Sequence, residues 1–326
     1  MPTFGLEEEV FVLEPDLPSL NSLYYLSKLL WKNPKLNYRL TASNFSRGAD
    51  TRQALMSGVE VATKVHDNPD DLVDDLARRR VDLSAVSEGL IAPIGHLINL
   101  STPTNVCALQ LHVGNVADLE IAYGNLAHFL PVLNLLAVNS PYAGGVYFGQ
   151  SFRMAHGYSI GKLKEDPYYR FQDIIITKRL GTIELRSPEP VWDLKRVRVL
   201  ATAAAAIAEI KKPIPLNREA YNGARGGVAK DGYTDALSAL YNELKQIVDV
   251  PEEMIKNTAS DEVKDFYAEH GLTKTYSALD NGYREGVFAA RQLPQVKSKA
   301  LKSLAGLAGY YVPKFPYVVW KYLKEK

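Results

Sequence analysis

The sequence contains a single cysteine, Cys107, so it can form neither an internal disulfide nor a thiolate metal cluster. Its most apolar stretches, 126–138 and 199–208, are too short to span a bilayer. Thirty-eight basic and 37 acidic residues leave a net charge of +1, which favours neither a nucleic-acid nor a membrane partner. The first four residues lack the pattern of a signal peptide. We therefore expect a soluble, cytoplasmic protein, and the sequence leaves homo-oligomerisation open.

Several common catalytic signatures are also missing. The chain has no Gly-x-x-x-x-Gly-Lys-Ser/Thr phosphate loop, no His-Glu-x-x-His and no Gly-x-Ser-x-Gly. It has no internal repeat and no low-complexity linker, and 46% hydrophobic residues can bury a sizeable core. We predict one catalytic domain over residues 1–326, in which residues 234–326 form a helical C-terminal part.

Alternation of apolar and polar residues predicts the strands. Residues 5–13 form the clearest case, in which Glu7 and Glu9 lie on one face about 6.5 Å apart. The same alternation predicts further strands over 57–62, 107–113, 173–177 and 181–186. Strands with one apolar and one polar face predict an α+β fold. We expect a curved, mainly antiparallel sheet with helices on its outer side and an open polar face.

Helical spacing and capping residues predict the helices. Asn68-Pro69 and Asp193 have the side chains that begin a helix, and Gly89 and Pro213 follow the ends of two helical patterns. Glycine and proline predict a loop over 142–149. The expected helices cover 17–31, 67–89, 125–138, 193–210, 234–248, 260–270 and 298–307.

The polar face of the predicted sheet concentrates charge. It carries four carboxylates, one imidazole and one guanidinium: Glu7, Glu9, Glu60, Glu184, His112 and Arg186. Such a face would repel itself unless cations bound there, and Mg²⁺ bridged to phosphate is the usual solution. Taken alone, each glutamate could be a solvated residue on a strand surface, and the histidine could be packed in the interior. The prediction of a metal site therefore depends on finding all these residues on one face.

Five motifs occur in the order seen in one ligase family. They are Gly5-Leu6-Glu7-Glu8-Glu9, Gly58-Val59-Glu60-Val61-Ala62-Thr63, Leu111-His112-Val113-Gly114, Ala137-Val138-Asn139-Ser140-Pro141-Tyr142 followed by Ser151-Phe152-Arg153, and Gly181-Thr182-Ile183-Glu184-Leu185-Arg186. With these motifs the first 235 residues resemble the glutamate-cysteine ligase type 2, or carboxylate-amine ligase, family. That family is similar to glutamine synthetase in its catalytic fold.

The resemblance implies an ATP-dependent ligase that joins a carboxylate, typically the side chain of glutamate, to an amine. It implies Mg²⁺, with Mn²⁺ as an alternative, held by Glu7, Glu9, Glu60 and Glu184. Arg153 and Arg186 would be catalytic, because a planar guanidinium can donate two parallel hydrogen bonds to the phosphoryl group or to the substrate carboxylate. His112 and Arg225 would bind the nucleotide, His112 as a donor to phosphate. A place for His112 among the metal ligands is the alternative, less favoured because Mg²⁺ prefers oxygen. His96 could lie near the active site, or it could have a purely structural role; the sequence fits both equally well.

Two departures from the family bear on the substrate. Gln110 stands where the family often has a second histidine, and the segment between Arg153 and Gly181 is short. Two other functions stay open: a metal-dependent carboxylate phosphotransferase or hydrolase on the same fold, and an inactive binding protein. Only the ligase requires both a carboxylate and an amine for ADP release.

Overall fold

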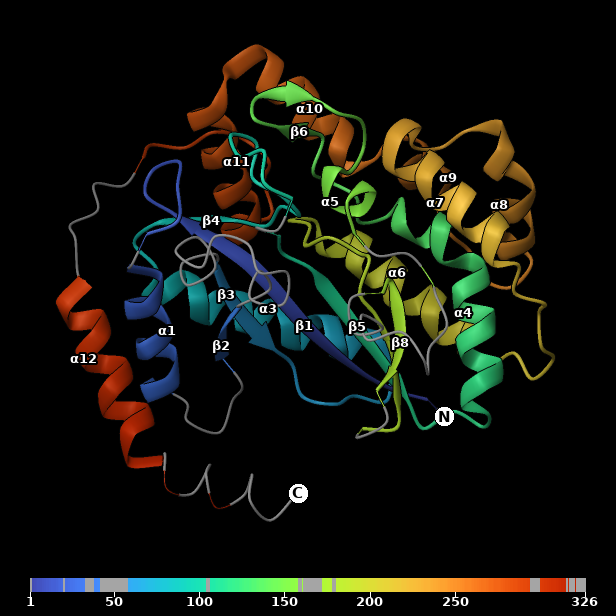
Figure 1. Ribbon diagram of the computed structural model, residues 1–326, viewed down its shortest axis with the longest axis horizontal. Helices are drawn as coiled ribbons and strands as arrows, with labels where there is room; N and C mark the ends of the chain where they lie inside the picture. Colours follow the sequence, from blue (N-terminus) through green and yellow to red (C-terminus); the bar gives the residue numbers. More distant parts are fainter. Residues whose placement is uncertain are drawn as a thin grey trace.

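An antiparallel sheet forms the centre of the protein (Figure 1). The structure is a computed structural model that describes residues 2–19, 21–32, 38–41, 58–103, 106–157, 160, 172–177, 180–293, 300–314, 316 and 320. Six strands follow the order β2-β3-β1-β5-β9-β8, and β4 pairs with the end of β1. The strands are β1 (Thr3–Leu13), β2 (Tyr38–Thr41), β3 (Gly58–Ala62), β4 (Leu90–Ala92), β5 (Leu109–Gly114), β8 (Ile174–Thr177) and β9 (Thr182–Leu185). Every pairing among these described strands is antiparallel, as predicted.

Helices cover one face of the sheet and its edges. Figure 1 shows α3, α4 and α6 along one face, α1 and α12 at the β2 edge, and α10 and α11 beyond the β4 end. The longer helices are α1 (Asn21–Lys32), α3 (Pro69–Val86), α4 (Leu119–Asn134), α6 (Leu194–Ala208), α7 (Arg218–Asp231), α8 (Ser238–Lys245), α10 (Ala259–His270), α11 (Leu272–Glu285) and α12 (Ala300–Tyr311). The predicted α+β fold, with helices on one side of the sheet, is confirmed. None of the described helices is both long and apolar enough to cross a membrane.

The helix ends follow local chemistry where the sequence has a clear cap. The Asn68 side chain accepts a hydrogen bond from the Asp71 amide at 2.9 Å and begins α3, and Asp193 caps α6 in the same way. The helix predicted over 125–138 has both ends wrong. Asp118 caps α4, which begins at Leu119, six residues before the predicted start at residue 125. The helix ends at Asn134, after passing through Pro131.

The loop predicted over 142–149 contains a small hairpin. Its strands are β6 (Tyr142–Ala143) and β7 (Val146–Tyr147). Gly144 and Gly145 connect them with φ of +58° and +77°, the two positive values that a type I′ turn requires. The sequence assigned no boundaries to several other elements, among them α7, α11, β2 and β4.

The apolar face of β1 contains one charged residue, Glu8, which is fully buried. Its carboxylate accepts hydrogen bonds from Arg80 of α3, at 2.5 Å from Nη2 and 3.2 Å from Nε. Arg80 also donates to the carbonyls of Val191 and Trp192. One buried ion pair therefore connects the central strand, a covering helix and the segment that precedes α6.

A second buried carboxylate, Asp75 of α3, makes stability depend on pH. Burial raises the pKa of Asp75, but hydrogen bonds from the Lys64 amide, Arg79 and His66 outweigh this and lower it from 3.8 to about 2. A carboxyl group whose pKa is lower in the folded protein than in the unfolded chain stabilises the fold at pH values above its unfolded pKa. This stabilisation is lost as the pH falls through the folded pKa. We expect Asp75→Asn to cost about 2 kcal/mol at pH 6, a penalty that shrinks between about pH 4 and pH 2.

Urea unfolding of both proteins across this pH range measures the penalty directly. Other carboxylates titrate equally in the two proteins, so their contributions cancel in the difference. A difference that stays constant from pH 6 to pH 2 would contradict the assignment.

Candidate functional site

The strand registers bring the predicted site residues onto one face of the sheet. Glu9 lies opposite Glu60, Gly5 opposite His112, and His112 opposite Glu184. Because residues directly opposite one another point to the same face, the predicted shared face is present in the structure. Glu7 is on it as well, opposite Gln110.

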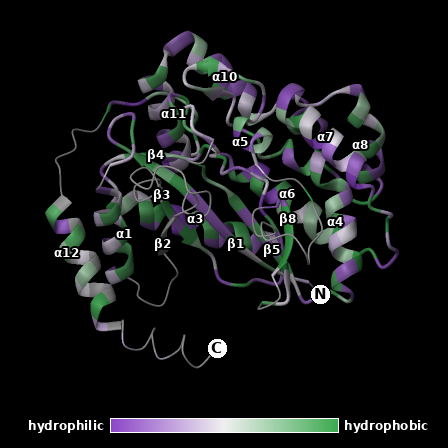
Figure 2. Ribbon diagram, viewed as in Figure 1, coloured by the Kyte–Doolittle hydropathy of each residue, from purple (hydrophilic) through white to green (hydrophobic). Residues whose placement is uncertain are grey.

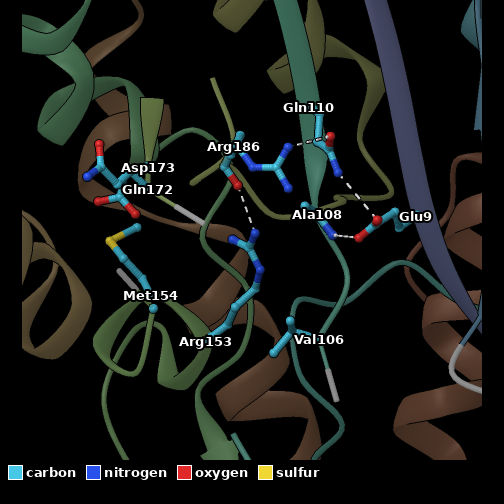
Figure 3. Close-up of a pocket in the computed structure, with 10 residues that line it drawn as sticks. Glu9, Val106, Ala108, Gln110, Arg153, Met154, Gln172, Asp173 and Arg186 are labelled. Carbon is cyan, nitrogen blue, oxygen red and sulfur yellow. Dashed lines mark hydrogen bonds between the residues drawn. The ribbon is translucent and has the colours of Figure 1, made fainter. Parts of the chain in front are cut away.

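A chain of hydrogen bonds runs across this face. The Glu9 carboxylate accepts from the Ala108 amide at 3.0 Å and from the Gln110 side-chain nitrogen at 3.3 Å. The Gln110 oxygen accepts from Arg186 at 3.3 Å, and Arg186 also forms an ion pair with Glu184. Thr177 of β8 donates to the other Glu184 oxygen at 3.0 Å. Residues of β1, β5, β9 and β8, with Arg186 just past the end of β9, thus hold one another in a single network. Figure 3 shows the part of it that joins Glu9, Gln110 and Arg186.

Gln110 has a role that the sequence reasoning missed. An amide donates through its nitrogen and accepts through its oxygen, so Gln110 connects the Glu9 carboxylate to the Arg186 guanidinium. The available signal was its position two residues before His112, on the same face.

A cavity of about 110 Å³ opens at the end of this network. Two arginines from different elements reach it, Arg153 from α5 (Phe152–Ala155) and Arg186 from the segment after β9 (Figure 3). The described lining residues are Glu9, Val106, Ala108, Gln110, Arg153, Met154, Gly157, Gln172, Asp173 and Arg186. A cavity of this size takes a small polar group such as a carboxylate or a few waters.

Arg153 holds the backbone that carries Arg186. Its two terminal nitrogens donate to the carbonyls of Arg186 and Ser187, both at 2.7 Å. Burial lowers the pKa of the Arg153 guanidinium, and the nearby carboxylates of Glu189, Glu9 and Asp173 oppose that shift. The Arg186 side chain is 27% exposed and therefore remains accessible at the cavity.

Arg225 of α7 forms a buried ion pair with Asp173, and its guanidinium also donates to the Met154 carbonyl. Tyr221 of the same helix donates to Asp173 at 2.8 Å. Arg225 therefore ties α7 to α5 and to the cavity wall, and its contact with a nucleotide stays a prediction. Asp173 was predicted only as the start of a strand.

His112 and His96 have different surroundings. The His112 Nδ1 lies 3.5 Å from the Thr182 hydroxyl, and its buried Nε2 has no hydrogen-bond partner within the described part of the chain. His96 is fully buried, and its Nε2 donates to the Thr102 carbonyl at 3.0 Å. The centre of its ring lies 4.6 Å from that of the Phe152 ring. Burial lowers the pKa of His96. His112 can turn a ring nitrogen toward a ligand, whereas His96 packs in the core.

The predicted metal ligands fall into two groups on the face. Glu7, Glu9 and Glu60 occupy neighbouring register positions, with Glu9 and Glu60 6% and 8% exposed. Glu184 is two strands away and four residues out of register from Glu9, a Cα separation of about 16 Å. That span is too long for Glu9 and Glu184 to share one ion. Over the residues that the structure describes, no three His, Cys, Asp or Glu side chains are arranged to hold a metal.

Glu189 holds the start of α5 in place. The sequence did not identify this residue as functional. It is fully buried, and its carboxylate accepts from the Asn139 amide and from the Ser140 and Ser151 hydroxyls, each at 2.5 Å. Ser151 in turn caps α5 by accepting from the Met154 amide at 2.9 Å. A Cβ on Gly95 would lie 2.3 Å from the Glu189 carboxyl carbon, so this position requires glycine. The Asn139-Ser140 and Ser151-Phe152-Arg153 motifs therefore position Arg153 through Glu189.

We expect Glu189→Ala to lower the free energy of unfolding by about 2 to 3 kcal/mol. The substitution leaves the buried Asn139 amide without an acceptor, whereas the two serine hydroxyls can rotate toward each other across 3.4 Å. Urea unfolding measures the loss. Glu189→Gln keeps an acceptor and should cost less than Glu189→Ala; equal losses for the two variants would contradict this account.

The described strands form an antiparallel sheet with one face under helices and a charged face beside a small cavity. Solved structures identify the fold more closely. The chain aligns with glutamate-cysteine ligase from Francisella tularensis, crystallised with AMP, at a TM-score of 0.59 and 12% identity over 98% of this chain and 94% of that one. The chain therefore has the fold of glutamate-cysteine ligase.

A second solved structure, the bifunctional glutathione synthetase from Pasteurella multocida, aligns at a TM-score of 0.53 and 12% identity. The alignment covers 95% of this chain and 52% of the synthetase, so the chain spans about half of that protein. No protein-family model matches the sequence, and no curated protein matches it.

Proposed function

We propose that this protein is an ATP-dependent carboxylate-amine ligase that forms a γ-glutamyl amide through an acyl phosphate. The observation that carries the proposal is the charged sheet face with its two-arginine cavity, set in a fold that aligns with glutamate-cysteine ligase along 98% of the chain. A carboxylate resists attack by an amine because oxide is a poor leaving group. Phosphorylation by ATP removes this barrier, and the amine then displaces phosphate.

The residues of the face suit the demands of phosphoryl transfer, which are positioning and charge neutralisation. Arg186, fixed by Glu184 and Gln110, would bind the substrate carboxylate or the transferred phosphoryl group. Arg153 would hold the Arg186 backbone in place and border the same cavity. His112 would donate from Nε2 to phosphate.

The carboxylates fit oxygen-preferring divalent ions. We propose Glu7, Glu9 and Glu60 as the carboxylates at one end of the face, where one or two of them would hold an ion together with the ATP phosphates, and Glu184 as a ligand of a separate ion at the other end. Bound Mg²⁺ or Mn²⁺ would neutralise the negative charge of the ATP phosphates. Given the register separation between Glu9 and Glu184, the four glutamates would need at least two ions.

Purified protein, ATP, Mg²⁺ and pooled amino acids test the proposal when phosphate release and new product masses are measured together. A ligase releases ADP and phosphate only when a carboxylate and an amine are both present, and it yields a mass equal to their sum less water. Glutamate and cysteine are the first pair to test. Phosphate release without an amine would instead indicate the phosphotransferase or hydrolase, and no release with any pair would indicate a binding protein.

A further inference from the structure

The main chain that carries Arg186 is held from two sides. The amides of Arg186 and Ser187 both donate to the Asp173 carbonyl, at 2.7 and 3.1 Å. On the other side, Arg153 donates to the carbonyls of the same two residues, as Figure 3 shows for Arg186. Asp173 lies just before β8 and Arg186 just past the end of β9, where the β8–β9 pairing ends. The placement of the Arg186 side chain therefore depends on Asp173 as well as on Arg153.

Two side chains of α7 hold the Asp173 carboxylate. The Tyr221 hydroxyl donates to one carboxylate oxygen at 2.8 Å, and Arg225 donates to the same oxygen from Nε. The Arg225 Nη2 lies 3.4 Å from the other oxygen. Tyr221 and Arg225 are four residues apart, so they share one face of the helix. Asp173, Tyr221 and Arg225 are only 5%, 3% and 6% exposed, so water competes little for these hydrogen bonds.

The same face of α7 also contacts the element that carries Arg153. The Arg225 Nη2 donates to the carbonyl of Met154, the residue that follows Arg153 in α5. Figure 2 shows hydrophilic and hydrophobic residues mixed along α7, which packs against α4 and α5. The Arg225 guanidinium therefore connects the two supports of Arg186, namely Asp173 and α5.

We propose that Tyr221, Arg225 and Asp173 are positioning residues for Arg186. Through Asp173, α7 sets where the Arg186 guanidinium lies at the cavity, so Tyr221 and Arg225 act without touching the substrate. A displacement of about 1 Å in a binding group can lower a rate by about 10²-fold, so a support of this kind affects catalysis strongly. The effect on catalysis rests on the proposed ligase function, whereas the effect on the Arg186 main chain does not.

Hydrogen exchange of the full-length protein without substrates tests the support directly. Tyr221→Phe removes one hydrogen bond to a charged group, so we expect the Arg186 and Ser187 amides to exchange about tenfold faster. Amides of β3, three strands away from β9, report global unfolding and should change less. Tyr241→Phe is the matched control, because Tyr241 is 2% exposed and its hydroxyl also donates at 2.8 Å, to the Val250 carbonyl beyond α8. This control should leave exchange at residues 186 and 187 as in the wild type.

Turnover of the same variants separates positioning from a merely structural role. We expect Tyr221→Phe to lower ATP-dependent phosphate release about tenfold, a smaller loss than that of Arg186→Ala, and Tyr241→Phe to keep wild-type turnover. If Tyr221 acts only through Arg186, the double variant Tyr221→Phe, Arg186→Ala loses no more activity than Arg186→Ala alone. Tyr221→Phe retains the Asp173–Arg225 ion pair, so the variant should fold.

Two results would overturn the proposal: unchanged exchange of the Arg186 and Ser187 amides in Tyr221→Phe, or losses of activity that add in the double variant. Either result leaves the ligase function itself in place. A wild-type protein without ligase activity would instead refute the proposed function, and the exchange rates alone would then decide whether α7 supports Arg186.

Discussion

Arg186→Ala is expected to lower ADP formation by about 10²- to 10³-fold while leaving the fold intact, which is the range for removing one preorganised donor to a developing charge. Arg186 reaches the cavity with its side chain 27% exposed, and Glu184 and Gln110 hold its guanidinium in place. No pairing within the sheet depends on its side chain, because Arg186 lies just past the end of β9. The measurement is ATP-dependent phosphate release with the substrate pair that the wild type uses.

Two companion variants make this result interpretable. Glu184→Gln keeps hydrogen-bonding groups beside Arg186 and Thr177 but removes the charge, and it should also lose most activity. Arg198→Ala removes an arginine that pairs with Asp70 and Asp74 on the outer helices, and it should keep wild-type turnover. Near-normal turnover of Arg186→Ala with an unchanged melting temperature would remove Arg186 from the site.

Arg80→Ala is expected to destabilise the protein by about 3 to 5 kcal/mol, the largest loss of stability that we predict for one side chain. The substitution leaves the Glu8 carboxylate fully buried with its charge uncompensated and deprives the Val191 and Trp192 carbonyls of a donor. Arg80 also lies over the Tyr283 ring of α11, 4.9 Å from its centre, so contacts to three other elements are lost together.

Urea unfolding at neutral pH measures this loss, with Arg78→Ala as the control. Arg78 is two residues away on the same helix and its side chain is 63% exposed, so its removal should change stability by less than about 1 kcal/mol. The double variant Glu8→Leu, Arg80→Leu removes both charges and should recover much of the loss. Equal stabilities of wild type and Arg80→Ala would show that Glu8 has another means of compensation.

The sequence by itself determined five strands of the sheet, the charged face and the fold class; the strands are β1, β3, β5, β8 and β9. Alternation along β1 places Glu7 and Glu9 together whatever the strand packs against, because neighbouring side chains on a strand point to opposite faces. Caps such as Asn68 and Asp193 bond to amides within three residues, so they too could be identified from the sequence alone. The residues of the face were therefore predictable, although their metal and nucleotide roles remain predictions.

Only the tertiary structure decided which distant residues meet. Arg80 is 72 residues from Glu8, Glu189 is 38 residues from Ser151, and Gln110 connects Glu9 to Arg186 across three strands. None of these pairs leaves a periodic signal, since each depends on the register of the sheet and on how the helices pack over it. The alternation of side chains along a strand follows from the backbone geometry of adjacent residues, so it can be read from the sequence. The hydrogen-bond partner of a buried polar group depends instead on which elements pack against it in the folded protein.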